Sequence, residues 1–218
     1  MALLNVAILI SGRGSNMQAL VRESQKAGTP FRVVCVLSNQ ADAQGLVWAK
    51  EQGIKTVLVS HKDFGKDRLA FDKAVDEKLR QHGVQLVCLA GFMRLLTGWF
   101  VDQWRDQLIN IHPSLLPAFP GLDVQQQAID YGAKVSGCTV HFVREEMDRG
   151  PLIVQAVVPV LPDDTADSLA ARILKQEHLI YPAAVRWIAQ NRVNVVDEKV
   201  FVTGVSTPES LINPVLAE

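Results

Sequence analysis

Residues 5–16 read NVAILISGRGSN, a short apolar run that passes directly into a glycine-rich turn. An uninterrupted apolar run is typical of a β-strand that is covered on both faces, as in parallel sheets. Ser15 or Asn16 can cap a following helix. Gly28 suits the position just after its expected end near residue 27. This order of strand, loop and helix predicts the first unit of an α/β fold.

The same alternation continues along the first half of the chain. Apolar runs that suit buried strands lie at 31–38, 55–59, 84–90 and 107–112. Helical patterns separate them at 42–52, 66–81 and 97–104. Strands joined by helical crossovers predict a parallel sheet with right-handed connections.

The pattern changes after residue 112. The second half is expected to contain a proline-rich loop near 113–122, a helix at 123–131, long strands at 133–143 and 150–160, a helix over 165–190 and a small hairpin over 193–202. The two long strands are predicted to form a hairpin or an antiparallel extension of the sheet. Asp164 is expected to cap the long helix, and Pro182 to kink it. The small hairpin should turn at Asp197 and Glu198.

The fold class predicted from these patterns is α/β. We expect a Rossmann-like, mostly parallel sheet with an antiparallel C-terminal extension. No repeat or linker divides the chain, so we expect one domain over 1–204 and a C-terminal tail over 205–218.

Composition limits the class of protein. The chain has 218 residues, of which 48% are hydrophobic and 21% charged, enough for one substantial core. A formal net charge of -1 gives no basic field toward nucleic acid or an anionic membrane. The first ten residues, MALLNVAILI, are too few to span a bilayer and lack the features of a signal peptide. A cytoplasmic protein is therefore expected.

Neither disulfides nor a metal site are expected. The three cysteines, Cys35, Cys88 and Cys138, lie in apolar runs and form no CxxC pair, which predicts reduced core residues. No HExxH motif or other tight set of metal ligands occurs.

The SGRGSN turn at 11–16 suits a phosphate group. Its glycines let backbone N–H groups approach a ligand, and the helix behind adds the positive end of its dipole. The same glycines also serve in tight turns that bind nothing. Met17 stands where a dinucleotide motif has its third glycine, and no GKS or GKT follows. The remaining prediction is a site for one phosphomonoester, held by backbone N–H groups and by Ser15 and Asn16.

AGFMRLL at 90–96 leaves the sheet beside the strand at 107–112. Backbone groups there could bind a flat heterocycle. The alternative is an ordinary turn with a surface arginine.

The stretch LINIH at 108–112 carries polar side chains in an apolar strand. Alternation places Asn110 and His112 on the same face of the strand. An amide and an imidazole that converge on one point can stabilise an oxyanion, which points to acyl-type transfer. The alternative is a neutral core histidine that fills space.

Two acids could complete such a site. Asp148 lies in the turn REEMDRG and, if that turn folds toward the strand at 107–112, would hold His112 in its charged form. By itself, an aspartate in a turn more often serves the turn. Glu177 lies on the long helix and could bind a substrate amine if it is buried; otherwise it is a solvated helix residue.

These stretches together resemble the folate-dependent phosphoribosylglycinamide formyltransferases. The resemblance runs from about Asn5 to Val202 and rests on ISGRGSN, LSN with ADAQGL, LAGFMRLL, INIHPSLLPAFPGL, GCTVHFVREEMDRGPLIVQ and QEHLIYP. It implies transfer of the formyl group of 10-formyltetrahydrofolate, a co-substrate, to the amine of glycinamide ribonucleotide. Small-molecule substrates, no metal, and a monomer or homodimer are expected.

The resemblance also implies roles for particular residues. Its catalytic residues correspond to Asn110, His112 and Asp148, with Asp148 positioning a water. The substrate-binding residues correspond to Gly14, Ser15, Asn16 and Glu177. The folate-binding residues correspond to Arg68, Met93, Arg94, Leu95, Leu96 and Asn110. Arg149 and Ala118 depart from the common glycine and lysine, which bears on affinity more than on chemistry.

Three alternatives share some of these features. Methionyl-tRNA formyltransferases resemble the chain around NIHPSLLP but need an added tRNA-binding domain and a basic surface. Formyltetrahydrofolate deformylases carry an additional N-terminal regulatory domain. A non-catalytic nucleotide-binding module would use only SGRGSN and would leave Asn110, His112 and Asp148 without a common purpose.

Overall fold

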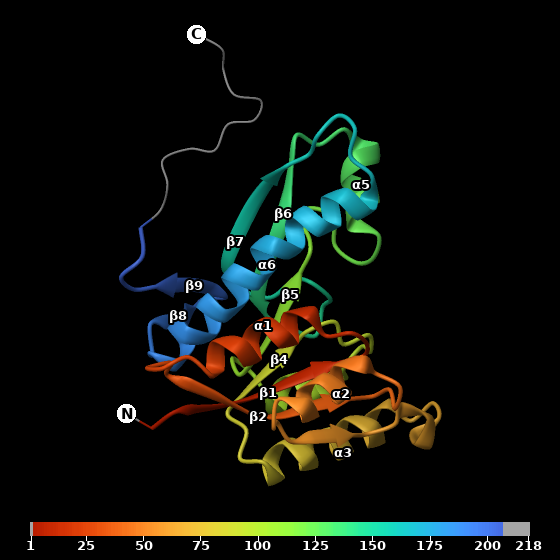
Figure 1. The fold of residues 1–218 in the computed structure, drawn as a ribbon, viewed down its shortest axis with the longest axis vertical. Helices are drawn as coiled ribbons and strands as arrows, with labels where there is room; N and C mark the ends of the chain where they lie inside the picture. The colour runs from red at the N-terminus through yellow and green to blue at the C-terminus, as the bar shows by residue number, and fades with distance from the viewer. Residues whose placement is uncertain (1, 207–218) are drawn as a thin grey trace.

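The computed structural model describes residues 2–206, which fold around a seven-stranded sheet. The strands of this sheet are β1 (Leu4–Ile10), β2 (Phe31–Ser38), β3 (Thr56–Leu58), β4 (Leu86–Leu89), β5 (Leu108–His112), β6 (Val135–Phe142) and β7 (Leu152–Pro159). They lie in the order β3-β2-β1-β4-β5-β6-β7. Strands β1 to β5 are parallel to one another. Strand β6 pairs antiparallel with β5, and β7 pairs antiparallel with β6. The predicted fold class is confirmed (Figure 1).

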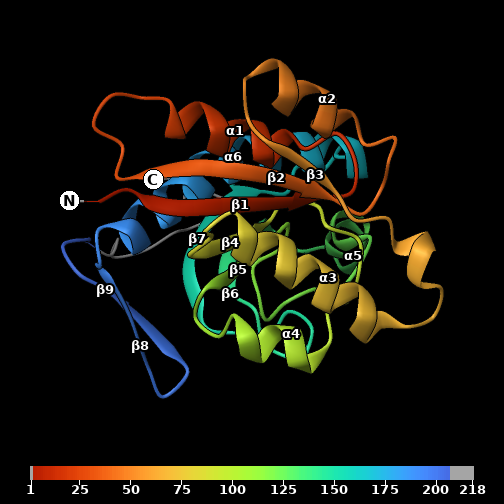
Figure 2. The ribbon, with the colours of Figure 1, turned by 90° about the horizontal axis from the view of Figure 1, so that it is seen from below.

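Helices cover both faces of the sheet (Figure 2). They are α1 (Ser15–Ser24), α2 (Gln44–Glu51), α3 (Arg68–Gln81), α4 (Gly98–Gln103), α5 (Val124–Tyr131) and α6 (Ala166–Ala189). Side chains of α1, α2 and α6 pack on one face, and those of α3 and α4 on the other. Consecutive residues of β1 therefore enter different cores: Ile8 faces α1 and α6, and Leu9 faces α3 and α4. This two-sided burial explains the uninterrupted apolar run.

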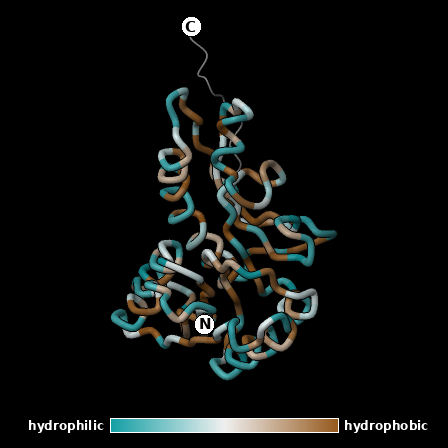
Figure 3. The backbone as a smooth tube through the Cα atoms, turned by 90° about the vertical axis from the view of Figure 1, so that its right-hand side faces the viewer, coloured by the Kyte–Doolittle hydropathy of each residue, from teal (hydrophilic) through white to brown (hydrophobic). Residues whose placement is uncertain are grey.

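The distribution of hydropathy along the chain follows this layering. Figure 3 shows hydrophobic segments running through the interior and hydrophilic segments at the outer turns. The three cysteines are buried and free, as expected, and burial raises the pKa of Cys35 and Cys138 to about 12. Within residues 2–206, none of the helices combines the length and the apolar character that a membrane crossing requires.

Two predicted helix caps are wrong. The N-cap residue of α1 is Gly14, with φ of 71° and no side-chain cap hydrogen bond, so neither Ser15 nor Asn16 caps the helix. Thr165, not Asp164, caps α6, because its hydroxyl accepts from the N–H of Ser168. Asp164 pairs instead with Arg172, whose hydrogen bonds lower the pKa of this carboxyl.

The C-terminal elements otherwise match expectation. Pro182 lies inside α6, which continues to Ala189; the kink itself stays a prediction. Strands β8 (Val193–Val196) and β9 (Lys199–Val202) form the predicted hairpin, with Asp197 and Glu198 in the left-handed conformation at its turn. Most of the expected tail, residues 207–218, lies outside the described residues.

Close packing of β6 against β7 makes Gly137 a sensitive position. A Cβ at Gly137 would lie 1.9 Å from the carbonyl oxygen of Ala156, a contact that backbone movement alone can relieve. We expect Gly137→Ala to lower the free energy of unfolding by about 3 kcal/mol or more, measured by urea denaturation. Gly12→Ala is the control, because a Cβ there has nothing within 4 Å. Equal urea midpoints for the two variants would show that this packing is looser than described.

Candidate active site

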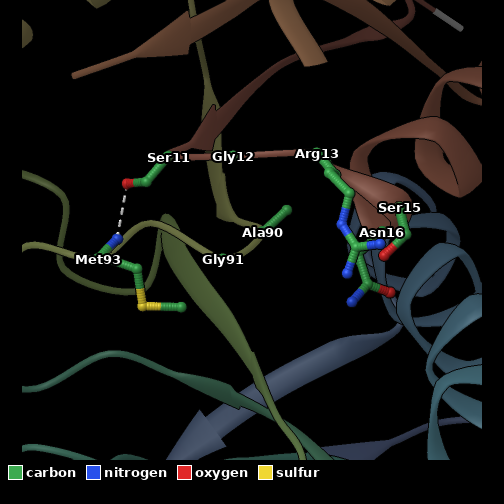
Figure 4. A pocket seen from close by; sticks show the side chains of 9 residues that line it. Ser11, Gly12, Arg13, Ser15, Asn16, Ala90, Gly91 and Met93 are labelled. Carbon is green, nitrogen blue, oxygen red and sulfur yellow. Dashed lines mark hydrogen bonds between the residues drawn. The ribbon is translucent and has the colours of Figure 1, made fainter. Parts of the chain in front are cut away.

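The three sequence stretches with candidate functional residues meet at the carboxyl edge of the sheet. SGRGSN follows β1, AGFMRLL follows β4, and Asn110 and His112 end β5, and these strands are neighbours. The strand order reverses between β1 and β4, which is where open α/β sheets bind ligands. A cavity of about 360 Å³ opens there, lined by residues 11–16, Ala90, Gly91 and Met93 (Figure 4).

The glycine loop joins the cavity to α6. Gly14 adopts the left-handed conformation before α1, and the Nδ2 of Asn16 donates to Oε2 of Glu177 at 2.6 Å. The Oδ1 of Asn16 is buried and has no hydrogen-bond partner among the described residues. The structure thus brings together Asn16 and Glu177, which the resemblance assigned to one substrate although they are 161 positions apart.

Glu177 is a buried carboxyl, exposed by only 6%. Burial raises its pKa, and the hydrogen bond from Asn16 opposes that shift in part. A buried carboxylate with one neutral partner can gain a further cationic or N–H partner from a ligand.

Arg13 is a residue that the sequence analysis overlooked. It lies in the glycine loop, lines the cavity, and lies with Ser15 and Asn16 at the side opposite Met93 (Figure 4). A guanidinium beside backbone N–H groups strengthens an anion site. Its position in the middle of SGRGSN was the available signal.

A second cluster surrounds His112 at the end of β5. The ring is 5% exposed; its Nε2 lies 3.1 Å from the carbonyl oxygen of Phe119, and its Nδ1 lies 3.6 Å from Oδ2 of Asp148. Because a carbonyl oxygen only accepts, Nε2 carries a proton. Asp148 is in the left-handed conformation, and its Oδ2 accepts from the N–H of Gly121 at 3.0 Å. The turn at 143–150 thus folds toward β5, as the sequence analysis required.

His141 also belongs to this cluster. It lies on β6 directly opposite Asn110, with Nδ1 2.9 Å from the carbonyl oxygen of Phe142. Its Nε2 lies 3.4 Å from Nδ2 of Asn110 and 3.8 Å from Oδ1 of Asp148. Burial lowers the pKa of His141, so a neutral ring accepts from the amide of Asn110. The sequence pattern does not reveal this role, because it leaves the pairing partner of β6 open.

The loop that contacts His112 is itself held by hydrogen bonds. Ser114 donates to the carbonyl of Ala118, and Thr139 donates to the carbonyl of Ser114. Thr139 also accepts from the N–H of Leu116. These bonds fix the position of Phe119 beside the imidazole without any helix in residues 113–121.

Of the predicted folate-binding residues, Met93 lines the cavity, Asn110 lies in the His112 cluster, and the others lie on or against the loop at 93–97. Met93 and Leu95 expose their side chains. Arg68 donates to the carbonyl oxygens of Leu95 and Leu96, at 2.8 and 3.4 Å, and so ties this loop to the start of α3. The guanidinium of Arg94 lies 4.8 Å from the centre of the Phe71 ring.

Asp72, on α3, fixes the end of the same loop. It is 1% exposed and accepts from both the N–H and the hydroxyl of Thr97, at 2.6 and 2.7 Å. This contact was not visible in the sequence pattern. Two side chains of α3, Arg68 and Asp72, therefore anchor residues 95–97 of the loop that follows β4.

A glycine loop, an amide–imidazole–carboxylate cluster and a cavity lie at the switch point of this α/β sheet, an arrangement suited to group transfer at a carbonyl carbon. Residues 4–185 match the formyl transferase family, and the chain belongs to that family.

Relatives and solved structures agree with this membership. The chain is 40% identical over 205 residues to "Phosphoribosylglycinamide formyltransferase" of Escherichia coli, covering 94% of this chain and 96% of that protein. It resembles the structure of glycinamide ribonucleotide transformylase 1 from Symbiobacterium toebii with a TM-score of 0.89 and 46% identity, covering 92% of this chain and 94% of that one.

A longer relative matches as well. The chain is 49% identical over 195 residues to the "Trifunctional purine biosynthetic protein adenosine-3" of Drosophila melanogaster, covering 88% of this chain. The chain spans only 14% of the length of that protein.

Proposed function

We propose that the protein transfers the formyl group of 10-formyltetrahydrofolate to the amine of glycinamide ribonucleotide, a step of purine biosynthesis. The observation that carries this proposal is the meeting of the glycine loop, Glu177 and the His112 cluster at one edge of the sheet. The names of the relatives support it. We further propose that residues 1–204 form a single formyltransferase domain.

The phosphate of the ribonucleotide would lie against the loop at Gly14, Ser15 and Asn16, with Arg13 adding charge. Glu177 would then accept from the N–H groups or hydroxyls of the same substrate. The folate would lie along Met93–Leu96, where the exposed side chains of Met93 and Leu95 provide an apolar surface.

The chemistry begins when the amine attacks the formyl carbon and creates a tetrahedral oxyanion. Both ring nitrogens of His112 face groups that only accept, the Phe119 carbonyl and the Asp148 carboxylate, so a ring that carries both protons has an acceptor near each N–H. The formyl oxygen would replace the Phe119 carbonyl as the partner of Nε2. Asn110 would donate to the same oxygen, with its amide oriented by neutral His141.

Proton transfer completes the reaction. His112 gives its proton to the oxyanion and takes it back as the tetrahedral intermediate collapses to the formamide. Asp148 would position a water that moves the proton from the amine to the leaving nitrogen of the folate. These reaction steps use no metal. The absence of a metal, the cytoplasmic location and the monomeric or dimeric state stay predictions.

An absorbance assay separates this function from its alternatives. The protein is mixed with a 10-formylfolate, with and without glycinamide ribonucleotide, and the folate absorbance is followed. A change that requires the ribonucleotide supports transfer. A change without it indicates hydrolysis, as in a deformylase, and no change under either condition favours a binding module. Both of the latter results would contradict the proposal.

Burial of the ionised Glu177 carboxyl should lower the free energy of unfolding at neutral pH. Its pKa is raised above 4.5 in the folded protein, so between 4.5 and that higher value the unfolded chain ionises while the folded one stays protonated. Stability is therefore lost as the pH rises through this window and remains lower above it. Glu177→Gln is expected to raise the urea midpoint at about pH 7, with the difference vanishing below 4.5.

Two controls accompany this experiment. Glu51→Gln changes an exposed glutamate of α2 and should leave the midpoint unchanged at every pH. Glu177→Gln should also raise the KM for the amine substrate at least about tenfold, since a charged acceptor is lost. A midpoint gain independent of pH, or no gain, would refute the described burial of Glu177.

A further inference from the structure

The hydroxyl of Ser11 lies between the two loops that the proposed function assigns to the two substrates. Ser11 directly follows β1 and begins the glycine loop. Its backbone N–H donates to the carbonyl of Gly91 at 3.0 Å, and its hydroxyl accepts from the N–H of Met93 at 2.8 Å (Figure 4). Ser11, in the glycine loop at 11–16, thus forms hydrogen bonds to two residues of the loop that follows β4, Gly91 and Met93.

Asn39 sets the direction in which that hydroxyl donates. Its side chain is buried, and its Oδ1 accepts the hydroxyl hydrogen of Ser11 at 2.6 Å. A hydroxyl has one hydrogen to donate, so a lone pair remains for the N–H of Met93. The carbonyl of Asn39 lies 2.9 Å from Nδ1 of His61, which donates to it because a carbonyl only accepts.

The loop at 93–97 is therefore fixed at both ends. Arg68 and Asp72 hold residues 95–97 against α3, and Ser11 holds Met93 against β1. Loss of the Ser11 hydroxyl would release the end nearer the cavity, because Met93 contributes to the cavity lining. The contacts from α3 would keep the rest of the loop in place.

We propose that Ser11 is a positioning residue that sets the backbone of Met93 relative to the phosphate loop, and thereby the binding of the formyl donor. The proposal rests on the proposed function, because it takes Met93–Leu96 as the folate contact. Ser11 acts through Met93, and Asn39 acts through Ser11. The donor should therefore depend on this chain of hydrogen bonds more than the ribonucleotide does.

The test is a KM-against-kcat comparison. Ser11→Ala is expected to raise the KM for a 10-formylfolate about five- to tenfold, the usual effect of one hydrogen bond. Its kcat and its KM for the ribonucleotide should change less than about threefold. Ser11→Thr, which keeps the hydroxyl, should restore the KM. Ser24→Ala is the matched control, since its hydroxyl donates within α1, to the carbonyl of Val21.

Asn39→Ala extends the test. It should raise the same KM, and Ser11→Ala with Asn39→Ala should be no worse than Ser11→Ala alone, because both act through one bond. If Asn39→Ala does not fold, the rescue by Ser11→Thr still decides the proposal. An unchanged donor KM in Ser11→Ala, or no rescue by threonine, would overturn it.

Calorimetry keeps this inference separate from the proposed function. The Kd of a 10-formylfolate is measured without the ribonucleotide, for the wild type and for Ser11→Ala. A wild type that binds the folate without transferring its formyl group overturns the proposed function alone, and the ratio of the two Kd values still tests Ser11. A wild type that does not bind the folate overturns both.

Discussion

Replacing His112 by alanine is expected to lower kcat by at least about a hundredfold, and up to about a thousandfold, while the fold survives. Removing one donor to a developing oxyanion typically has this effect, and His112 also supplies charge and a proton. Asp148 keeps its hydrogen bond from the N–H of Gly121 when the ring is lost, so the turn beside the ring stays anchored. The measurement is steady-state turnover with both substrates saturating.

A second histidine provides the control for this variant. His82 follows α3, remote from the cavity, and its Nδ1 lies 2.8 Å from the carbonyl of Lys78. His82→Ala should keep normal turnover. Near-normal turnover in folded His112→Ala would remove His112 from the chemistry and favour the interpretation as a space-filling core histidine.

Changing Asp148 to asparagine is expected to lower kcat about a hundredfold or more. The substitution removes the negative charge that lies 3.6 Å from His112 and 3.8 Å from His141. Asparagine tolerates the left-handed conformation of this position, and its amide oxygen can still accept from Gly121. The turn should therefore persist while the electrostatic support of the imidazolium is lost.

The control for Asp148 is an exposed aspartate. Asp130 lies in α5 and accepts from Gln126, and Asp130→Asn should leave kcat unchanged. Turnover in Asp148→Asn within about threefold of the wild type would mean that the aspartate serves only the turn, which is the alternative that its sequence position first suggested.

The order and type of the elements were predictable because their signals are local. The run NVAILI is apolar throughout because its residues enter two cores, and β2, β4 and β5 also contribute buried residues to both cores. The predicted caps of α1 and α6 were wrong because a neighbouring residue, Gly14 in one helix and Thr165 in the other, occupies the N-cap position. Ser15 and Asn16 follow Gly14, and Asp164 precedes Thr165, and only three-dimensional contacts decide between them.

The individual site residues were predictable from the sequence, but most contacts between residues far apart in the chain were not. Asn110 and His112 share a strand, so alternation placed them together. The proximity of Asn16 to Glu177 and of His112 to Asp148 depends on how α6 and the turn at 143–150 pack, which no local pattern records. His141 and Ser11 were missed for the same reason, because each acts through a partner on another strand or loop.

The fate of the formyl carbon itself distinguishes transfer from hydrolysis and from simple binding. A 10-formylfolate labelled with ¹³C in the formyl group is incubated with the protein and glycinamide ribonucleotide, and the products are observed by NMR. If the formyl group is transferred, the label appears in the N-formyl group of the ribonucleotide, one for each folate consumed. Label recovered as formate, or label that stays on the folate, would contradict transfer.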